Sequence, residues 1–138
     1  SVFYTEEGSA VRGLKAEYFN NIKLQGTPFK TGIDTTVSIN NGWHVASDRR
    51  GFPFDHCSLR WTGVVKPQQS GKYKFTVRGF DGFRLYVDDN EVINLWKEQG
   101  ITTKSVALDL SAGKAHKVRL EYHANSHPVD ISFAWHLV

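Results

Sequence analysis

The sequence predicts an all-β domain built as an antiparallel sandwich or barrel. Apolar and polar residues alternate over short segments, as where Tyr73, Phe75 and Val77 lie opposite Lys72 and Lys74. Turn-forming residues separate these segments, and no stretch has the apolar spacing of three and four that a long helix requires. Six to nine short strands with turns between them are typical of such folds.

The N-terminal half predicts only two strands. Leu14, Ala16 and Tyr18 alternate with less apolar neighbours, which predicts a strand within residues 11–20. Residues 21–56 are rich in Gly, Thr, Asn, Asp and Ser and contain Pro28 and Pro53. We therefore expect a loop-heavy segment there, with one weak strand at residues 36–39.

The second half has clearer alternation. It predicts strands at or near residues 59–61, 73–78, 83–88, 92–96, 106–110, 116–122 and 131–137, with tight turns at residues 68–71, 88–91 and 111–114. Trp61 and Trp135 fall on the apolar phase of their strands, so both are expected in the core.

Length and composition limit the classes of protein. The 138 residues are expected to form a single domain, and 40% hydrophobic content argues against disorder. No apolar run is long enough to cross a bilayer, and the net charge of +3 has no clustered basic stripe. We expect neither membrane insertion nor nucleic acid as a partner. Because the chain lacks Met, residues 1–138 are interpreted as a domain excised from a larger protein.

Cysteine and histidine give no metal or redox signal. Cys57 is the lone cysteine, so no internal disulfide or paired-cysteine zinc site can form. It begins a strand and is expected to be a small buried hydrophobe. The six histidines lack the spacing of a known metal motif, and most are expected on the surface, including His123 and His127 on either side of a turn.

The segment after residue 79 carries the best candidate site. Asp81-Gly82 is a turn pair, so we expect a hairpin with Asp81 at the tip of its loop. Sugar recognition requires hydrogen-bonding side chains, here Asp81 and Arg84, beside an aromatic face. Trp96 and Trp43 are candidates for that face, and each is equally well explained as a core residue.

Four separated motifs resemble the protective-antigen lectin-like family, here called the PA-fourteen family. They are residues 13–21, residues 59–63, Pro67 with residues 70–75, and residues 81–88, and the resemblance extends from Val11 to Trp135. It implies a lectin-like, jelly-roll β-sandwich. Such domains accompany bacterial glycosidases, yeast-type adhesins and the toxin that names the family, and most are not enzymes.

The resemblance also bears on calcium. Adhesins of this family hold calcium with two consecutive Asp residues joined by a cis peptide bond, and the matching pair here is Phe80-Asp81. Calcium requires six to eight oxygen ligands, so one carboxylate makes a poor cage. We expect no cofactor, and calcium is disfavoured.

Together these observations predict a secreted, non-catalytic carbohydrate-binding accessory domain of an extracellular or periplasmic glycoside hydrolase. It would bind glycan or shape the active site of a host catalytic domain in the same chain. The expected ligand-binding residues are Phe80, Asp81, Gly82, Arg84, Trp96 and Trp43. The alternative is a protein-protein assembly domain of a toxin or cell-surface adhesin. A catalytic pair of Asp55 and Asp81 is not favoured, because nothing in the sequence places them face to face.

Overall fold

The computed structural model describes residues 1–40, 55–125 and 129–138. In these ranges the chain forms ten strands and no α-helix, so no helix there is long and apolar enough to cross a membrane. The strands are β1 (Leu14–Phe19), β2 (Lys30–Asp34), β3 (Val37–Asn40), β4 (Cys57–Val65), β5 (Gly71–Phe80), β6 (Gly82–Val87), β7 (Asn90–Leu95), β8 (Thr102–Leu110), β9 (His116–Ala124) and β10 (Asp130–Leu137).

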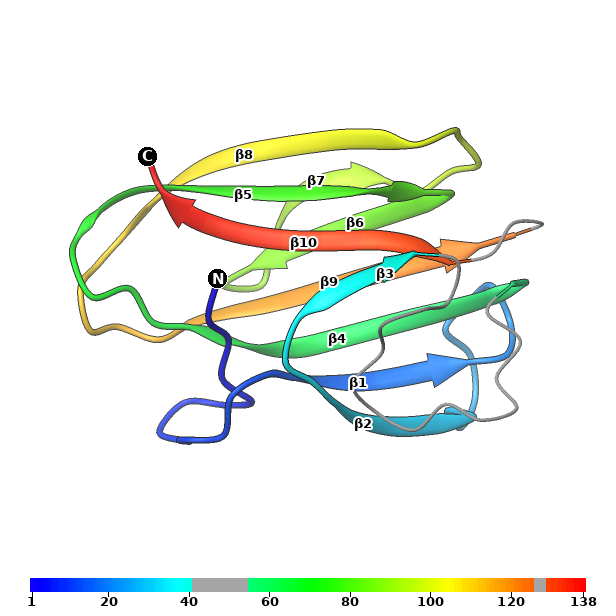
Figure 1. Ribbon diagram of the computed structural model, residues 1–138, viewed down its shortest axis with the longest axis horizontal. Coiled ribbons are helices and arrows are strands. Elements are labelled where there is room, and N and C mark those ends of the chain that lie inside the picture. Colours follow the sequence, from blue (N-terminus) through cyan, green and yellow to red (C-terminus); the bar gives the residue numbers. More distant parts are fainter. Residues whose placement is uncertain (41–54, 126–128) are drawn as a thin grey trace.

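The strands form two sheets that pack face to face (Figure 1). The larger sheet has the order β2-β1-β4-β9-β6-β7 and the smaller sheet has the order β3-β10-β5-β8. Every pairing is antiparallel. The predicted all-β sandwich is therefore confirmed.

The predicted strand pattern needs one addition, because β2 lies in the segment expected to be mostly loop. Its side chains are exposed or half-buried except for Asp34, so an edge strand of this kind shows no apolar alternation. The Asp34 carboxylate accepts hydrogen bonds of 2.7 Å from the Tyr18 hydroxyl and 2.9 Å from Nε1 of Trp61. These buried bonds join β2 to the core.

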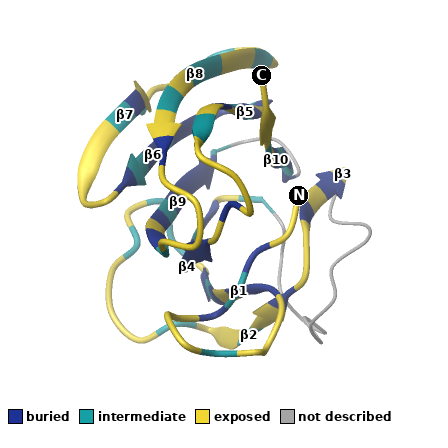
Figure 2. Ribbon diagram, turned by 90° about the vertical axis from the view of Figure 1, so that its left-hand side faces the viewer, coloured by how far each residue is buried: buried dark blue, intermediate teal, exposed yellow. Residues whose placement is uncertain are grey.

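The core consists of buried residues from both sheets. Figure 2 shows buried residues on strands of both layers. Trp61, Phe75 and Cys57 are each 0% exposed. Burial of Trp61 and of Cys57 was expected from the sequence. Trp135 is only half-buried, and its ring stacks on Phe75 with centroids 6.2 Å apart. Trp135 thus extends the aromatic core toward the edge of the smaller sheet.

The prediction of a hairpin after residue 79, formed by β5 and β6, is wrong. β5 pairs with β8 and β10, whereas β6 pairs with β7 and β9 in the other sheet. The chain therefore crosses between the two layers at Asp81, where the backbone N–H donates to the carbonyl of His123 at 3.2 Å. Asp81 is consequently 4% exposed and does not form a loop tip.

Candidate ligand-binding site

The crossover lies at one end of the sandwich, away from the two chain termini (Figure 1). At this end β5 and β9 finish, while β4, β6 and β10 begin. Five strand ends therefore surround Asp81, and the connecting segments form the surface over it. A residue placed there is held by both sheets.

The backbone on either side of Asp81 is fixed by buried hydrogen bonds. The Phe80–Asp81 peptide bond is cis. The hydroxyl of Tyr122, which is 0% exposed, donates to the carbonyl of Phe80 and accepts from the N–H of Asp130 at 3.1 Å. Burial raises the pKa of Tyr122, so this hydroxyl keeps its proton at neutral pH.

Within the described ranges, one oxygen of the Asp81 carboxylate has a hydrogen-bond partner and the other has none. Oδ2 accepts a hydrogen bond of 2.7 Å from the backbone N–H of Asn125. Oδ1 has no hydrogen-bond partner among the described residues. A buried carboxylate oxygen without a partner costs free energy, which a ligand hydroxyl or a water molecule can recover. Asp81 is therefore a ready acceptor at this end of the domain.

Three polar residues next to Asp81 were not predicted as site residues. His123 Nδ1 lies 2.6 Å from Oδ1 of Asn125, and Nδ2 of Asn125 donates to Oε1 of Glu98 at 2.5 Å. His123 is 5% exposed, so its expected surface position is wrong, and His116 at 4% is buried as well. Glu98, Asn125 and His123 come from two segments far apart in sequence, and no local motif connects them.

Trp96 and Arg84 form the rim of the site. The Arg84 guanidinium carbon lies 4.0 Å from the centroid of the Trp96 ring, and His123 meets that ring edge-on at 4.6 Å. Trp96 is half-buried, so it is neither a core residue nor a free platform. A cation over an aromatic face is an attractive contact, and it holds both side chains in place beside Asp81.

Arg84 is also tied to a buried carboxylate. Its Nε donates to Oε1 of Glu121 at 2.7 Å, and Nε of Arg60 donates to Oε2 at 2.8 Å. Glu121 is 2% exposed. Burial alone would raise the pKa of Glu121, but the hydrogen bonds and charges of Arg60 and Arg84 outweigh it and lower the pKa. Glu121 therefore remains ionised and anchors the arginine at the rim.

Gly82 is required by close packing. A Cβ atom there would lie 2.2 Å from Nε2 of His123 and 2.7 Å from the backbone nitrogen of Lys97. The segment that carries Trp96 passes directly over this position, so only glycine leaves it room. The structure thus gathers Asp81, Gly82, Arg84 and Trp96 at one end of the fold, with Phe80 half-buried beside them.

Two further positions were named from the sequence. Trp43 lies outside the described residues. Asp55, the other member of the disfavoured catalytic pair, is 3.8 Å from the exposed His56 side chain.

The described residues around Asp81 supply few oxygen donors for a calcium ion. Asp81 offers one available carboxylate oxygen, Phe80 occupies the position of a second carboxylate, and the Asn125 side chain is engaged by His123 and Glu98. Within the described ranges, no three His, Cys, Asp or Glu side chains are grouped to share a metal ion. Six to eight oxygens are needed for calcium.

Residues 11–137 match the family model of the PA14 domain. The chain belongs to the PA14 domain family. This is the PA-fourteen family indicated by the four sequence motifs, and the match covers the crossover, the Trp96 segment and all ten strands.

Curated PA14 relatives include proteins of different kinds. The chain is 32% identical over 123 residues to the anti-sigma-I factor RsgI3 of Acetivibrio thermocellus, covering 89% of this chain and 19% of that protein. It is 26% identical to the protective antigen of Bacillus anthracis, with 85% and 14% covered. It is 28% identical to a xylan 1,4-beta-xylosidase of Xylanibacter ruminicola, with 80% and 12% covered. The chain spans less than a fifth of each.

Solved structures agree on the fold. An anti-sigma factor domain-containing protein superposes with a TM-score of 0.79 at 32% identity, covering 91% of this chain and 43% of that one. The beta-glucosidase of Kluyveromyces marxianus in complex with glucose gives 0.75 at 20% identity, with 100% and 17% covered. A PA14 sugar-binding domain from an RTX adhesin gives 0.68 at 21%, with 92% and 90% covered. PA14 domains thus occur in glycoside hydrolases, anti-sigma factors and adhesins.

Proposed function

We propose that this PA14 domain binds carbohydrate without catalysis, through the site around Asp81, on behalf of a larger protein. The observation that carries the proposal is the Asp81 carboxylate, 4% exposed and with Oδ1 unpaired among the described residues. A fixed carboxylate oxygen is suited to accept a hydrogen bond from a sugar hydroxyl, and charge-assisted bonds of this kind are the stronger ones.

The neighbouring side chains support a sugar rather than a simple ion. The exposed part of Trp96 offers an aromatic surface for the C–H side of a sugar ring. Arg84 is 27% exposed, and its N–H groups other than Nε have no hydrogen-bond partner within the described ranges, so they can donate to further hydroxyls. Acceptor, donor and aromatic ring together are the usual elements of sugar recognition.

We propose that this binding needs no calcium and that the host protein acts outside the cytoplasm. The first proposal rests on the single available carboxylate. The second rests on the relatives, which include a protective antigen, an RTX adhesin and a xylosidase. A glycoside hydrolase as host is supported by the xylosidase match, and an anti-sigma factor as host is supported by the RsgI3 match and by the anti-sigma factor domain-containing structure.

The assembly-domain alternative has less support. It would require a contiguous apolar patch, since stable protein interfaces bury an extended surface. Among the described residues, the exposed large apolar side chains are few and come from different stretches of the sequence: Val2, Val11, Phe29, Ile33, Ile101, Leu137 and Val138. Glycan binding therefore remains the better proposal.

A glycan array tests the proposal. The labelled domain is applied with calcium and again with a chelator, beside the variants Asp81→Asn and Asp109→Asn. Asp109 is a matched control, because its carboxylate is exposed on β8 and is 3.4 Å from Lys72. We expect the wild type and Asp109→Asn to bind the same glycans in both conditions, and Asp81→Asn to lose them. Equal signals from all three proteins would overturn the assignment of the site.

A further inference from the structure

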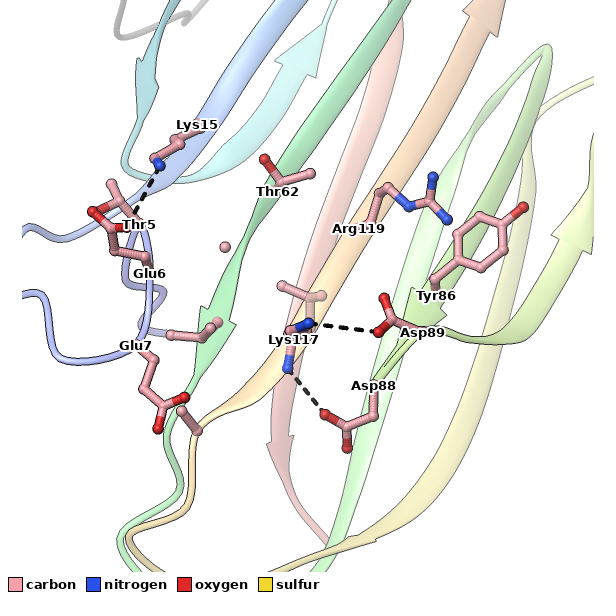
Figure 3. A pocket seen from close by; sticks show the side chains of 14 residues that line it. Thr5, Glu6, Glu7, Lys15, Thr62, Tyr86, Asp88, Asp89, Lys117 and Arg119 are labelled. Atoms are coloured by element: carbon pink, nitrogen blue, oxygen red, sulfur yellow. Dashed lines mark hydrogen bonds and ion pairs between the residues drawn. The ribbon is translucent and has the colours of Figure 1, made fainter.

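A second concave surface lies on the outer face of the larger sheet, at the opposite end of β9 from His123. It is a groove of about 450 Å³. Its floor includes one row of side chains in register across four strands, Lys15, Thr62, Arg119 and Tyr86. Figure 3 shows Thr62 between Lys15 on one side and Arg119 on the other. Its volume lies within the usual range of small-molecule sites.

Two acidic segments form the walls of the groove. The N-terminal segment contributes Glu6 and Glu7, and it lies along β4 because Tyr4 exchanges backbone hydrogen bonds with Val64 at 3.0 and 2.8 Å. The β6–β7 turn contributes Asp88 and Asp89, both with positive φ. The walls therefore supply acceptors, while the lysine and arginine side chains of the floor supply donors.

Asp88 is closely held, with Oδ2 2.8 Å from Nδ1 of His116 and Oδ1 accepting from the Lys117 backbone N–H at 3.1 Å, but two other ion pairs in the groove are loose. Lys15 Nζ lies 3.8 Å from Glu6, and Lys117 Nζ lies 3.6 Å from Asp89. Both pairs are well exposed, and exposed pairs of this kind contribute little stability. A ligand can therefore take over these donors and acceptors at small cost. The Arg119 side chain is held more firmly than the two lysines, because its guanidinium carbon lies 4.1 Å from the centroid of the Tyr86 ring.

The charge balance indicates a neutral ligand. Four carboxylates and three cationic side chains line the groove, so neither an anion nor a cation meets a field of one sign. Sugar hydroxyls both donate and accept hydrogen bonds, which suits an alternation of ammonium groups, carboxylates and the Thr62 hydroxyl. Val64 and Val118 add apolar surface to the lining for the C–H side of a sugar ring.

We propose that this groove is a second carbohydrate-binding site, which takes a neutral oligosaccharide independently of Asp81. This rests on the proposed function, because it assumes that the domain binds glycan. His123 at the Asp81 site and Lys117 in the groove are six residues apart on β9, or about 20 Å at strand spacing. The outward side chains of Arg60, Arg84 and Glu121 lie between them. The two sites share no residue.

Backbone amide NMR shifts of the ¹⁵N-labelled domain, titrated with xylohexaose and with cellohexaose, test the proposal. Gly82 and Asn125 report on the Asp81 site, whereas Gly63, Asp89 and Lys117 report on the groove. Two groove variants are compared with wild type, Thr62→Tyr, which fills the floor, and Lys117→Gln, which removes a donor. Thr76→Tyr is the matched control, since Thr76 lies on β5 in the other sheet and bonds to Ser105 at 2.9 Å.

We expect both groups of amides to shift in the wild type and in Thr76→Tyr. Thr62→Tyr or Lys117→Gln should weaken binding measured at the groove amides by about tenfold, and Asp81→Asn should leave those shifts unchanged. Shifts confined to Gly82 and Asn125 would overturn the second site and leave the proposed function standing. Groove shifts that vanish in Asp81→Asn would also overturn it. No shift in either group would overturn both.

Discussion

The backbone N–H of Asn125 donates a hydrogen bond of 2.7 Å to Oδ2 of Asp81. This bond joins the crossover between the two sheets to the end of β9, so the position of the carboxylate is set by both layers. The second oxygen is held in place without a protein partner among the described residues. If the proposed ligand binds here, the carboxylate is already in position, which reduces the ordering cost of binding.

Gly82→Ala is expected to destabilise the domain by at least about 2 kcal/mol, because the new Cβ would meet His123 and the backbone of Lys97 at less than 3.0 Å. The backbone at Lys97 would have to move to make room for the new Cβ. This movement should displace Trp96 and weaken glycan binding. Gly100→Ala is the matched control, since a Cβ there meets nothing within 4 Å. Urea unfolding of both variants checks this. Equal stabilities for the two variants would contradict the packing described around Gly82.

The alternation of apolar residues predicted strands at or near β4 to β10, because most of these strands turn one face toward the core. β2 was not predicted, because Asp34 is its only buried residue. Asp81 was predicted at a loop tip, whereas the structure places it at a buried crossover between the sheets. Asp-Gly is typical of a turn tip, whereas here Gly82 admits a crossing segment.

Long-range contacts explain why the rest of the site was missed. His123, Asn125 and Glu98 come together only because β9 and the segment after β7 end at the same edge as the crossover. The spacing of these three residues in the sequence gives no sign that their side chains lie together.

Glu121→Gln is expected to lower the free energy of unfolding at neutral pH by about 3 kcal/mol, since it leaves two half-buried arginines without their buried anion. The pKa of Glu121 is below its ordinary value of 4.5. The stability it contributes is therefore complete above that value and is lost as pH falls through the lower pKa of the folded state. Urea unfolding between about pH 7 and pH 3 should show a steeper loss in the wild type than in the variant.

Glu17→Gln provides the control for that pH series. Glu17 lies on the same face and is 3.4 Å from Arg60, but its side chain is 36% exposed. Its loss should therefore cost less than about 1 kcal/mol. A Glu121→Gln variant as stable as Glu17→Gln, with the pH dependence of the wild type, would refute a structural role for the buried carboxylate.

Cys57 is expected to resist thiol reagents in the folded protein. It is 0% exposed, and burial, together with the charge of Asp55, raises its pKa to about 12. The reactive thiolate is thus scarce at mildly alkaline pH, and access requires unfolding. Labelling followed by absorbance, with and without urea, checks this expectation. Prompt labelling without urea would show that β4 opens locally at its first residue.

Chelation is expected to leave the melting temperature unchanged, because Asp81 supplies one available carboxylate oxygen and Phe80 supplies no side-chain ligand. An ion that binds only the folded state raises the melting temperature in proportion to its occupancy. Thermal unfolding in millimolar calcium and in chelator measures this. A rise of several degrees with calcium would contradict the account of the donor set.

The central claim is that the free oxygen of Asp81 binds a sugar hydroxyl. Calorimetric titration of wild type, Asp81→Asn and Asp81→Ala, using the glycan that scores highest on the array, tests it most directly. Asn retains an oxygen to accept the Asn125 N–H, so Asp81→Asn should keep the wild-type melting temperature. Both variants should nevertheless bind about ten to a hundred times more weakly, since each charge-assisted bond is worth about 1.5–3 kcal/mol. Equal affinities for the three proteins would contradict the claim.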